Sequence, residues 1–175
     1  MSSSSDPPHA DERGSALLRE EQPLAGVAAY EAAVDRLIGM ALGRIRIFDR
    51  QLDRSHNTAA RTEALRRFLL ASNANRVAIV VHDAARIRLD CPRLVELQRH
   101  FAHAVSIHRT QSMARGVYDP FCVVDGSHYA RRFHFDNPRG VLALNDADGA
   151  GALVQRFEEI WEVSQPAVTG TTLGL

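Results

Sequence analysis

The segment that most constrains the fold of this chain is Val77–Val81, an unbroken apolar run with the sequence VAIVV. Such a run is typical of a strand covered on both faces, as in the centre of a parallel sheet. Apolar residues spaced three and four apart predict helices around it, at 26–42 and 58–69 before the run and from Pro92 after it. Helices long enough to connect parallel strands therefore alternate with strands, which predicts an α/β domain.

Two shorter strand patterns lie between these helical segments, at Arg44–Asp49 and Val105–Ile107, and we expect them to pair in parallel with the central run. After Tyr118 the pattern changes to short apolar runs separated by the turn pairs Asp125-Gly126 and Asn137-Pro138. These runs are Phe121–Val124, Tyr129–Phe135 and Val141–Leu144, followed by an amphipathic helix over Ala147–Ser164. The predicted fold is α/β, a mixed sheet with parallel βα units followed by antiparallel strands and with helices on both faces.

The ends of the chain have a different composition. Residues 1–23 are rich in serine, proline and charge, and we expect a disordered tail because they carry too little apolar surface to offset the entropy of ordering. The domain is predicted over 24–167, with a flexible C-terminus over 168–175. No apolar run approaches the ~20 residues that span a bilayer, and no signal peptide is visible, so we expect a cytoplasmic protein without membrane contact.

The charge is balanced, with 21 basic and 21 acidic residues, which argues against general electrostatic capture of nucleic acid. All of the basic residues are arginine, so a lysine Schiff base, a lysine general base and a P-loop lysine are excluded. Cys91 and Cys122 are far apart and form no zinc-like cluster. We expect reduced, partly buried thiols, no metal centre and no cofactor.

The order of these elements, the strand ending in Val-Val-Asp-Gly and the last helix with Phe-Glu-Glu-Ile-Trp together resemble one half of the phospholipase D superfamily. In that family this strand carries HxKxxxxDG, with a nucleophilic histidine and a phosphate-binding lysine. Placing the family's Asp-Gly at Asp125-Gly126 puts its histidine at Tyr118 and its lysine at Pro120. Proline offers no charge and no donor, and tyrosine is a poor replacement for a nucleophilic imidazole.

The resemblance therefore implies a degenerate phospholipase-D-like half-domain, and we assign no catalytic residue. Similar domains occur in an uncharacterised bacterial family and are sometimes joined to acetyltransferase domains. Active members of the superfamily bring two halves together, so a single half implies a homodimer or a partner that supplies the second half. Asp125 matches the family aspartate, but an Asp-Gly pair is also a common hairpin turn, and we favour the turn.

Ionisable residues follow all three predicted parallel strands, where ligands of open α/β sheets gather. The candidates for binding an anion are Arg50, His82, His108, Arg109 and Arg115. Arginine forks could replace the missing lysine as phosphate ligands. The alternative is that these charges form ordinary loop salt bridges, or that His82, Asp83 and His108 hold a metal, although their spacing is not diagnostic.

Three functions stay open at this point. The first is a non-catalytic binding or regulatory domain with an unknown ligand, for which an anion is the candidate. The second is a phosphodiesterase or nuclease that uses His82 or His108 as its nucleophile. The third is an accessory partner of an acetyltransferase. Nucleic-acid binding through the predicted hairpin, where His128 and His134 flank Arg131-Arg132, is less favoured than a half-buried sheet edge.

Overall fold

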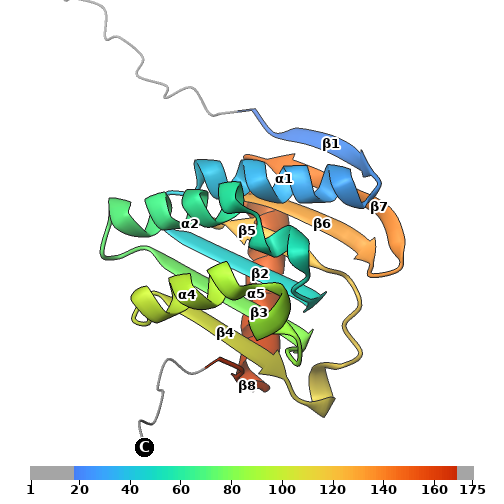
Figure 1. Cartoon of the computed structure of the whole chain (residues 1–175). Helices are drawn as coiled ribbons and strands as arrows, with labels where there is room; N and C mark the ends of the chain where they lie inside the picture. Colours follow the sequence, from blue (N-terminus) through green and yellow to red (C-terminus); the bar gives the residue numbers. More distant parts are fainter. Residues whose placement is uncertain (1–17, 169–175) are drawn as a thin grey trace, which may run out of the picture.

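The computed structural model describes residues 18–168 and places them around one eight-stranded sheet (Figure 1). The strands follow the order β1-β7-β6-β5-β2-β3-β4-β8 across the sheet. In chain order the elements are β1 (Glu20–Ala25), α1 (Val27–Met40), β2 (Arg44–Gln51), η1 (Arg54–Asn57), α2 (Ala59–Ala71), β3 (Arg76–Asp83), α3 (Ile87–Asp90), α4 (Pro92–His100), β4 (Val105–Thr110), η2 (Ser112–Ala114), β5 (Phe121–Val124), β6 (His128–His134), β7 (Asn137–Leu144), α5 (Ala147–Glu162) and β8 (Ser164–Pro166).

The centre of the sheet is parallel and its flanks are antiparallel. β2, β3 and β4 pair in parallel, with α2 and α4 in the crossover connections. β5 pairs antiparallel with β2, and β6, β7 and β1 continue the antiparallel flank. On the other edge β8 pairs antiparallel with β4. This topology confirms the predicted α/β fold class with its mixed sheet.

Helices cover both faces of the sheet, with α1, α2 and α4 on one face and α5 on the other (Figure 1). Two polar side chains near the start of α2 cap different helices. Thr58 Oγ1 accepts from the N–H of Arg61 and caps α2, whereas Asn57 Oδ1 accepts from the N–H of Arg93 and satisfies an amide in the first turn of α4. Asn57 and Thr58 therefore join the two helices that flank β3.

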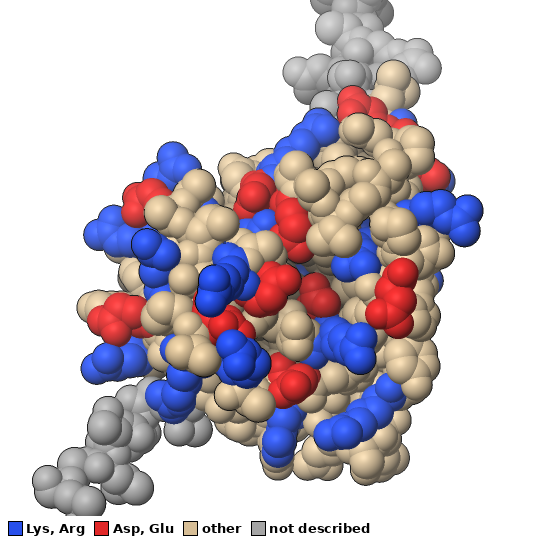
Figure 2. Space-filling view, turned by 45° about the vertical axis from the view of Figure 1, so that its right-hand side comes forward, with Lys and Arg blue, Asp and Glu red and all other residues tan. Residues whose placement is uncertain are grey.

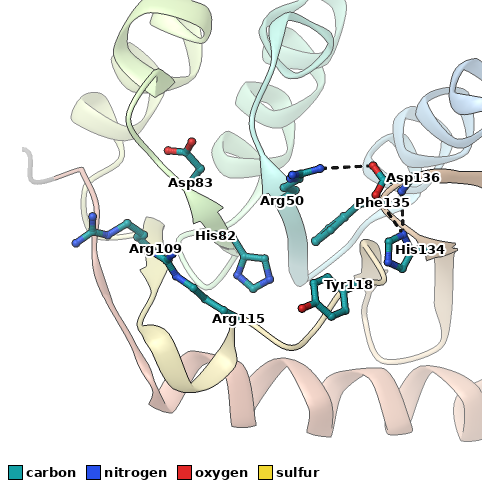
Figure 3. A pocket seen from close by; sticks show the side chains of 9 residues that line it. All are labelled: Arg50, His82, Asp83, Arg109, Arg115, Tyr118, His134, Phe135 and Asp136. Carbon is teal, nitrogen blue, oxygen red and sulfur yellow. Dashed lines mark hydrogen bonds and ion pairs between the residues drawn. The ribbon is translucent and has the colours of Figure 1, made fainter.

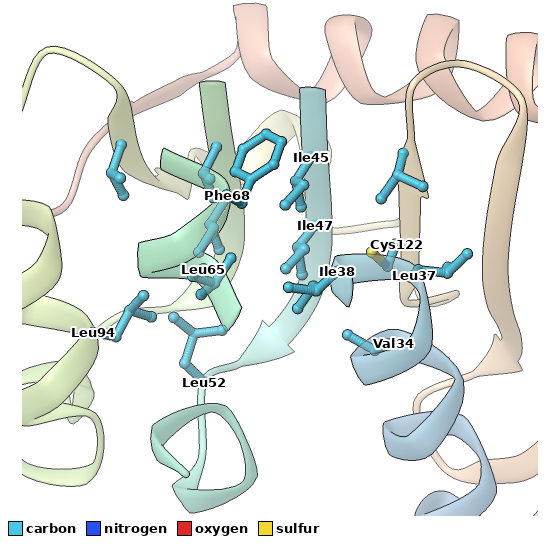
Figure 4. Packing of buried hydrophobic residues seen from close by; sticks show 14 of the residues in the cluster. Val34, Leu37, Ile38, Ile45, Ile47, Leu52, Leu65, Phe68, Leu94 and Cys122 are labelled. Atoms are coloured by element: carbon cyan, nitrogen blue, oxygen red, sulfur yellow. The ribbon is translucent and has the colours of Figure 1, made fainter. Parts of the chain in front are cut away.

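The apolar run of β3 is buried on both sides, as predicted. Val77, Ile79 and Val81 pack into the core beneath α1, α2 and α4, while Val80 packs beneath α5. Figure 4 shows the first of these two cores, in which side chains of the helices meet those of β2 and β5. Cys91 and Cys122 are both free and fully buried, in agreement with the expected reduced thiols.

The predicted ends of the domain need two corrections. Residues 20–23 were expected in the disordered tail, but they begin β1, which pairs with β7 from Glu20 to Ala25. Only Leu24 of this strand is buried, so it lacks the apolar alternation that reveals a strand in a sequence. At the other end Val168 is buried and its carbonyl oxygen accepts from Gln98 Nε2 at 3.3 Å.

The predicted last helix also ends earlier, at Glu162, and Ser164–Pro166 form β8. Residues 1–17 of the predicted tail and 169–175 of the predicted flexible C-terminus lie outside the described residues. Within residues 18–168, no helix combines the length and the apolar character needed to cross a membrane.

Candidate functional site

A pocket of about 530 Å³ lies at the edge of the sheet where β2, β3 and β4 end, and we call it the strand-exit pocket (Figure 3). It is lined by Arg50, His82, Asp83, Arg109, Arg115, Tyr118, His134, Phe135 and Asp136. The first four lie on the ends of the parallel strands, and the others come from the segment before β5, from the end of β6 and from the turn after it. Four of the five predicted anion candidates therefore share one pocket.

His108 is the candidate that the pocket does not contain. In the parallel register of β3 and β4, His108 pairs with Val80, so it lies two residues deeper in the sheet than His82. Its ring stacks on Trp161 of α5, with centroids 3.7 Å apart. Burial lowers the pKa of His108, which keeps the ring neutral. The structure therefore does not place His108 beside the other four candidates.

The ring of His82 is held from two directions. Nε2 lies 2.7 Å from the carbonyl oxygen of Val117, and Nδ1 lies 2.7 Å from Oγ1 of Thr110. Burial lowers the pKa of His82, and the nearby guanidinium groups of Arg115 and Arg50 act in the same direction. Neither ring nitrogen is free to attack a substrate, because one donates to a carbonyl and the other accepts from a hydroxyl.

The three arginines of the pocket differ in their pairing. Arg50 forms an exposed ion pair with Asp136 at 3.5 Å (Figure 3). Arg109 and Arg115 are exposed, and neither forms an ion pair or a side-chain hydrogen bond with any other part of the described chain. Their guanidinium groups are therefore available to bind an anionic ligand.

The positions of the degenerate motif fall at both ends of β5. Tyr118 lines the pocket, is half-exposed and stacks on His134 with ring centroids 5.4 Å apart. Pro120 is buried, and its carbonyl oxygen accepts from the N–H of Arg132 at 2.9 Å. The Tyr118 and Pro120 positions thus lie at the same edge of the sheet as the arginines.

Asp125 lies at the opposite end of β5, away from the pocket, and its carboxylate binds main chain. Oδ2 accepts from the N–H of Leu42 at 2.7 Å, and Oδ1 accepts from the N–H groups of Gly43 and Arg44 at 2.8 Å. Asp125 and Gly126 both have positive φ, 52° and 66°, as a hairpin turn of type I′ requires. The structure shows the turn that the sequence analysis favoured.

Sequence reasoning missed Asp119, which lies between the two degenerate positions. Its buried carboxylate pairs with Arg156 of α5 and with Nε of Arg131 of β6, the latter at 3.0 Å. This arrangement ties the segment before β5 to both neighbouring elements. A single aspartate in a loop gives no sequence signal for such a role, because its partners lie 12 and 37 residues further along the chain.

Phe135 and Asp136 were also missed as pocket residues. Strict alternation along β6 would put His134 and Phe135 on opposite faces of the sheet. The register of β6 and β7 shifts between Arg132 and His134, and both His134 and Phe135 line the pocket. The ring of Phe135 lies 5.6 Å from that of His82, centroid to centroid, and forms part of the pocket wall.

Residues 10–170 match the protein family described as Domain of unknown function (DUF7931). Among curated proteins, none matches the chain. Among solved structures, the phospholipase D family member Nuc from Salmonella typhimurium is similar to this chain, with 14% identity and a TM-score of 0.62. The match covers 85% of this chain and 98% of Nuc.

Two further solved structures share the fold. TrmBL2, an archaeal chromatin protein, has 9% identity and a TM-score of 0.61, over 83% of this chain and 53% of its own. The phosphatidylserine synthase of Haemophilus influenzae has 14% identity and a TM-score of 0.59, over 90% of this chain and 42% of its own. The chain therefore belongs to the family described as Domain of unknown function (DUF7931), and its described residues have a phospholipase-D-like fold.

Proposed function

We propose that this chain is a non-catalytic phospholipase-D-like domain that binds a phosphate or a phosphate ester in the strand-exit pocket. The observation that carries the proposal is the pair Arg109 and Arg115, which line this pocket without a carboxylate partner in the described residues. Guanidinium groups bind phosphate oxygens through paired hydrogen bonds, so two of them supply the charge that a lysine would otherwise provide.

Neither of the two histidines that the sequence suggests as a nucleophile is placed for catalysis in this pocket. His82 uses both ring nitrogens for contacts with Val117 and Thr110, and His108 stacks on Trp161 outside the pocket. The resemblance to the phospholipase D superfamily implies that Tyr118 and Pro120 replace its nucleophilic histidine and phosphate-binding lysine. These observations favour binding over the alternative of a phosphodiesterase or nuclease with histidine chemistry.

The ligand is proposed to be small. Basic and acidic side chains alternate over the side that faces the reader in Figure 2, without one continuous basic area. A nucleic-acid backbone usually requires such an area. The chromatin protein TrmBL2 binds DNA, but its sequence identity to this chain is only 9%. An oligonucleotide therefore belongs among the test ligands.

A second copy of the chain, or a partner with a second half, is proposed to cover the mouth of the pocket. Tyr118 of the pocket is half-exposed, and the exposed side chains of Met113 and Phe133 lie close in sequence to the lining residues Arg115 and His134. Light scattering on the purified chain tests this association. The accessory role beside an acetyltransferase, like the cytoplasmic location, stays a prediction.

The test of the proposed function is calorimetric titration of the purified chain with inorganic phosphate, a short oligonucleotide and bis(p-nitrophenyl) phosphate, with hydrolysis of the last compound followed in parallel. We expect phosphate binding without hydrolysis, and binding weakened at least roughly tenfold in Arg109→Ala and in Arg115→Ala, because each removes a charge-assisted contact. Arg139→Ala is the matched control, since Arg139 is exposed on β7 and does not line the pocket.

Two results would overturn this proposal. The first is phosphate affinity that is equal in the two pocket variants and in the control, which would place the anion elsewhere. The second is hydrolysis by the wild-type chain that is lost in His82→Ala, which would establish a catalytic site.

A further inference from the structure

A second cavity of about 200 Å³ adjoins the strand-exit pocket and shares Arg50 and Phe135 with it. We call it the acidic cavity, because its lining includes the carboxylates of Glu31, Asp49 and Asp53. Asp49 and Arg50 are neighbours at the end of β2, so their side chains leave the strand on opposite faces. The two cavities therefore lie on either side of the same strand end.

Two of these carboxylates already have partners. Oε2 of Glu31 lies 2.8 Å from Nη1 of Arg61. Oδ1 of Asp53 accepts from the N–H of Ser55 at 2.8 Å and lies 3.6 Å from Nδ1 of His56. Both groups are therefore held by contacts within the protein, although Arg61 is shared with Asp35.

Arg132 also lines the acidic cavity, but its guanidinium is engaged by main chain. Nε donates to the carbonyl oxygen of Asn137 at 3.2 Å, and Nη2 donates to the carbonyl oxygen of Phe135. The same guanidinium lies over the ring of Tyr30, 5.8 Å from its centroid. Arg132 forms no ion pair with Asp49, so it does not supply the missing partner.

Asp49 is the remaining carboxylate of the cavity. Oδ1 accepts from the N–H of Arg50 at 2.6 Å, and in residues 18–168 the carboxylate forms no ion pair. Burial raises the pKa of Asp49 to about 6; Glu31 raises it further, whereas His56, Arg132 and the amide of Arg50 lower it. Asp49 is partly buried, and a carboxylate that is partly removed from water without a paired cation is unfavourable.

Resting on the proposed function, we infer that the natural ligand is zwitterionic, with its phosphate group beside Arg109 and Arg115 and an ammonium group on the same molecule paired with Asp49. The ligand reaches from one cavity to the other past Arg50 and Phe135. The exposed ion pair of Arg50 with Asp136 is weak enough to open, since such surface pairs contribute at most about 1 kcal/mol.

An organic cation fits this cavity better than a metal ion. In the part of the chain that the structure describes, no group of three or more histidine, cysteine, aspartate or glutamate residues is placed to hold a metal. One unpaired carboxylate suits a single ammonium group, which needs one counter-charge and donates up to three hydrogen bonds.

The test compares matched ligands by titration calorimetry on the full chain. One series contains ω-aminoalkyl phosphates of two to six carbons, and the other contains alkyl phosphates of the same lengths. At one chain length we expect the aminoalkyl phosphate to bind roughly tenfold more tightly than its alkyl counterpart, the effect of one charge-assisted contact. In Asp49→Asn that ratio should fall to about one, and thermal denaturation checks that the variant is folded.

The outcomes separate this inference from the proposed function. Equal affinity of both series at every length overturns the inference but leaves phosphate binding in place, whereas no binding of either series overturns both. A preference that survives in Asp49→Asn also overturns the inference. Loss of the preference in Asp83→Asn instead would place the ammonium group in the strand-exit pocket, which contradicts the assignment to Asp49.

The pH dependence gives an independent readout. The affinity ratio should decline as the pH is lowered from 7.5 through about 6, because protonated Asp49 cannot pair with an ammonium group. This comparison uses the longest ligands that bind, because an ammonium group close to the phosphate lowers its second pKa and makes the short members of the two series ionise differently. The groups facing Asp49 are Glu31, His56, Arg132 and Tyr30, and repeating the series in Asp49→Asn removes their contribution. A ratio independent of pH would contradict the inference.

Discussion

His82 Nε2 lies 2.7 Å from the carbonyl oxygen of Val117, a contact that fixes the protonation of the ring. A carbonyl oxygen only accepts, so Nε2 carries the proton and Nδ1 accepts from the hydroxyl of Thr110. The imidazole thereby joins β3, β4 and the segment before β5. His82, which the sequence suggests as a nucleophile, instead fixes the position of the segments that form the pocket wall.

Replacing His82 should therefore lower stability. His82→Ala leaves the carbonyl of Val117 and the hydroxyl of Thr110 without their partner, and we expect a loss of about 1–3 kcal/mol in the free energy of unfolding. His82→Gln, whose amide can donate and accept, should recover part of this loss. Urea denaturation followed by circular dichroism measures both values. A His82→Ala variant as stable as wild type would contradict the bracing role.

Stability should also depend on pH through His82. Burial lowers its pKa in the folded state, so the unfolded chain binds a proton more readily. The free energy of unfolding should fall as the pH is lowered below the ordinary histidine pKa of about 6.5. This part of the decline should be absent in His82→Gln, so the two denaturation curves should converge toward low pH. Parallel curves would show that His82 titrates normally.

The parallel centre of the fold could be predicted because its strands are apolar on both faces and its helices have a clear period. β1 could not, since four of its first five residues are exposed and the strand is held by main-chain pairing with β7. β8 has only three residues, none of them buried. Patterns of hydrophobicity do not reveal strands that bury almost nothing.

From the sequence, the candidate site could be predicted only through the ionisable residues that follow the parallel strands. The sequence places His82 and His108 after strands, but the register of β3 with β4 decides that Thr110, rather than His108, contacts His82. The register of two strands depends on how they pack across the sheet, and the sequence of one strand alone does not determine it. The same holds for Phe135, which follows the last residue of β6 and the register shift between Arg132 and His134 and lines the pocket.

Asp125 should contribute to stability and not to ligand binding. Asp125→Ala removes the acceptor of the N–H groups of Leu42, Gly43 and Arg44, and we expect a loss of about 1–2 kcal/mol because water can reach these exposed groups. Asp125→Asn keeps one acceptor oxygen and tolerates positive φ, so it should lose less. Phosphate affinity at a temperature where the variants are folded should equal that of wild type. A selective loss of phosphate binding in Asp125→Asn would assign this residue to the site.

Two glycines of α5 should respond in opposite ways to alanine. A Cβ at Gly149 would lie 2.5 Å from Oδ2 of Asp146 and 2.8 Å from the hydroxyl of Tyr129, so it displaces the carboxylate that caps the helix. We expect Gly149→Ala to lose about 1–2 kcal/mol, the value of a cap. Gly151→Ala meets nothing within 4 Å and should gain up to about 1 kcal/mol from helix propensity. Thermal denaturation of both variants measures the two changes in melting temperature. Equal changes would contradict the contact at Gly149.

Asp49→Asn should make the chain more stable at neutral pH. The folded pKa of about 6 lies above the ordinary value, so the folded state disfavours the charged carboxylate and this penalty is fully present above pH 6. Asparagine keeps an acceptor for the N–H of Arg50 and carries no charge, and we expect a gain of about 1–2 kcal/mol at pH 7.5. The gain should shrink as the pH falls through 6 and vanish below about 4, where the aspartate is protonated in both states. Urea denaturation of wild type and Asp49→Asn across this range measures the difference. A variant that is less stable than wild type at pH 7.5 would mean that Asp49 has a counter-charge within the protein and needs none from a ligand.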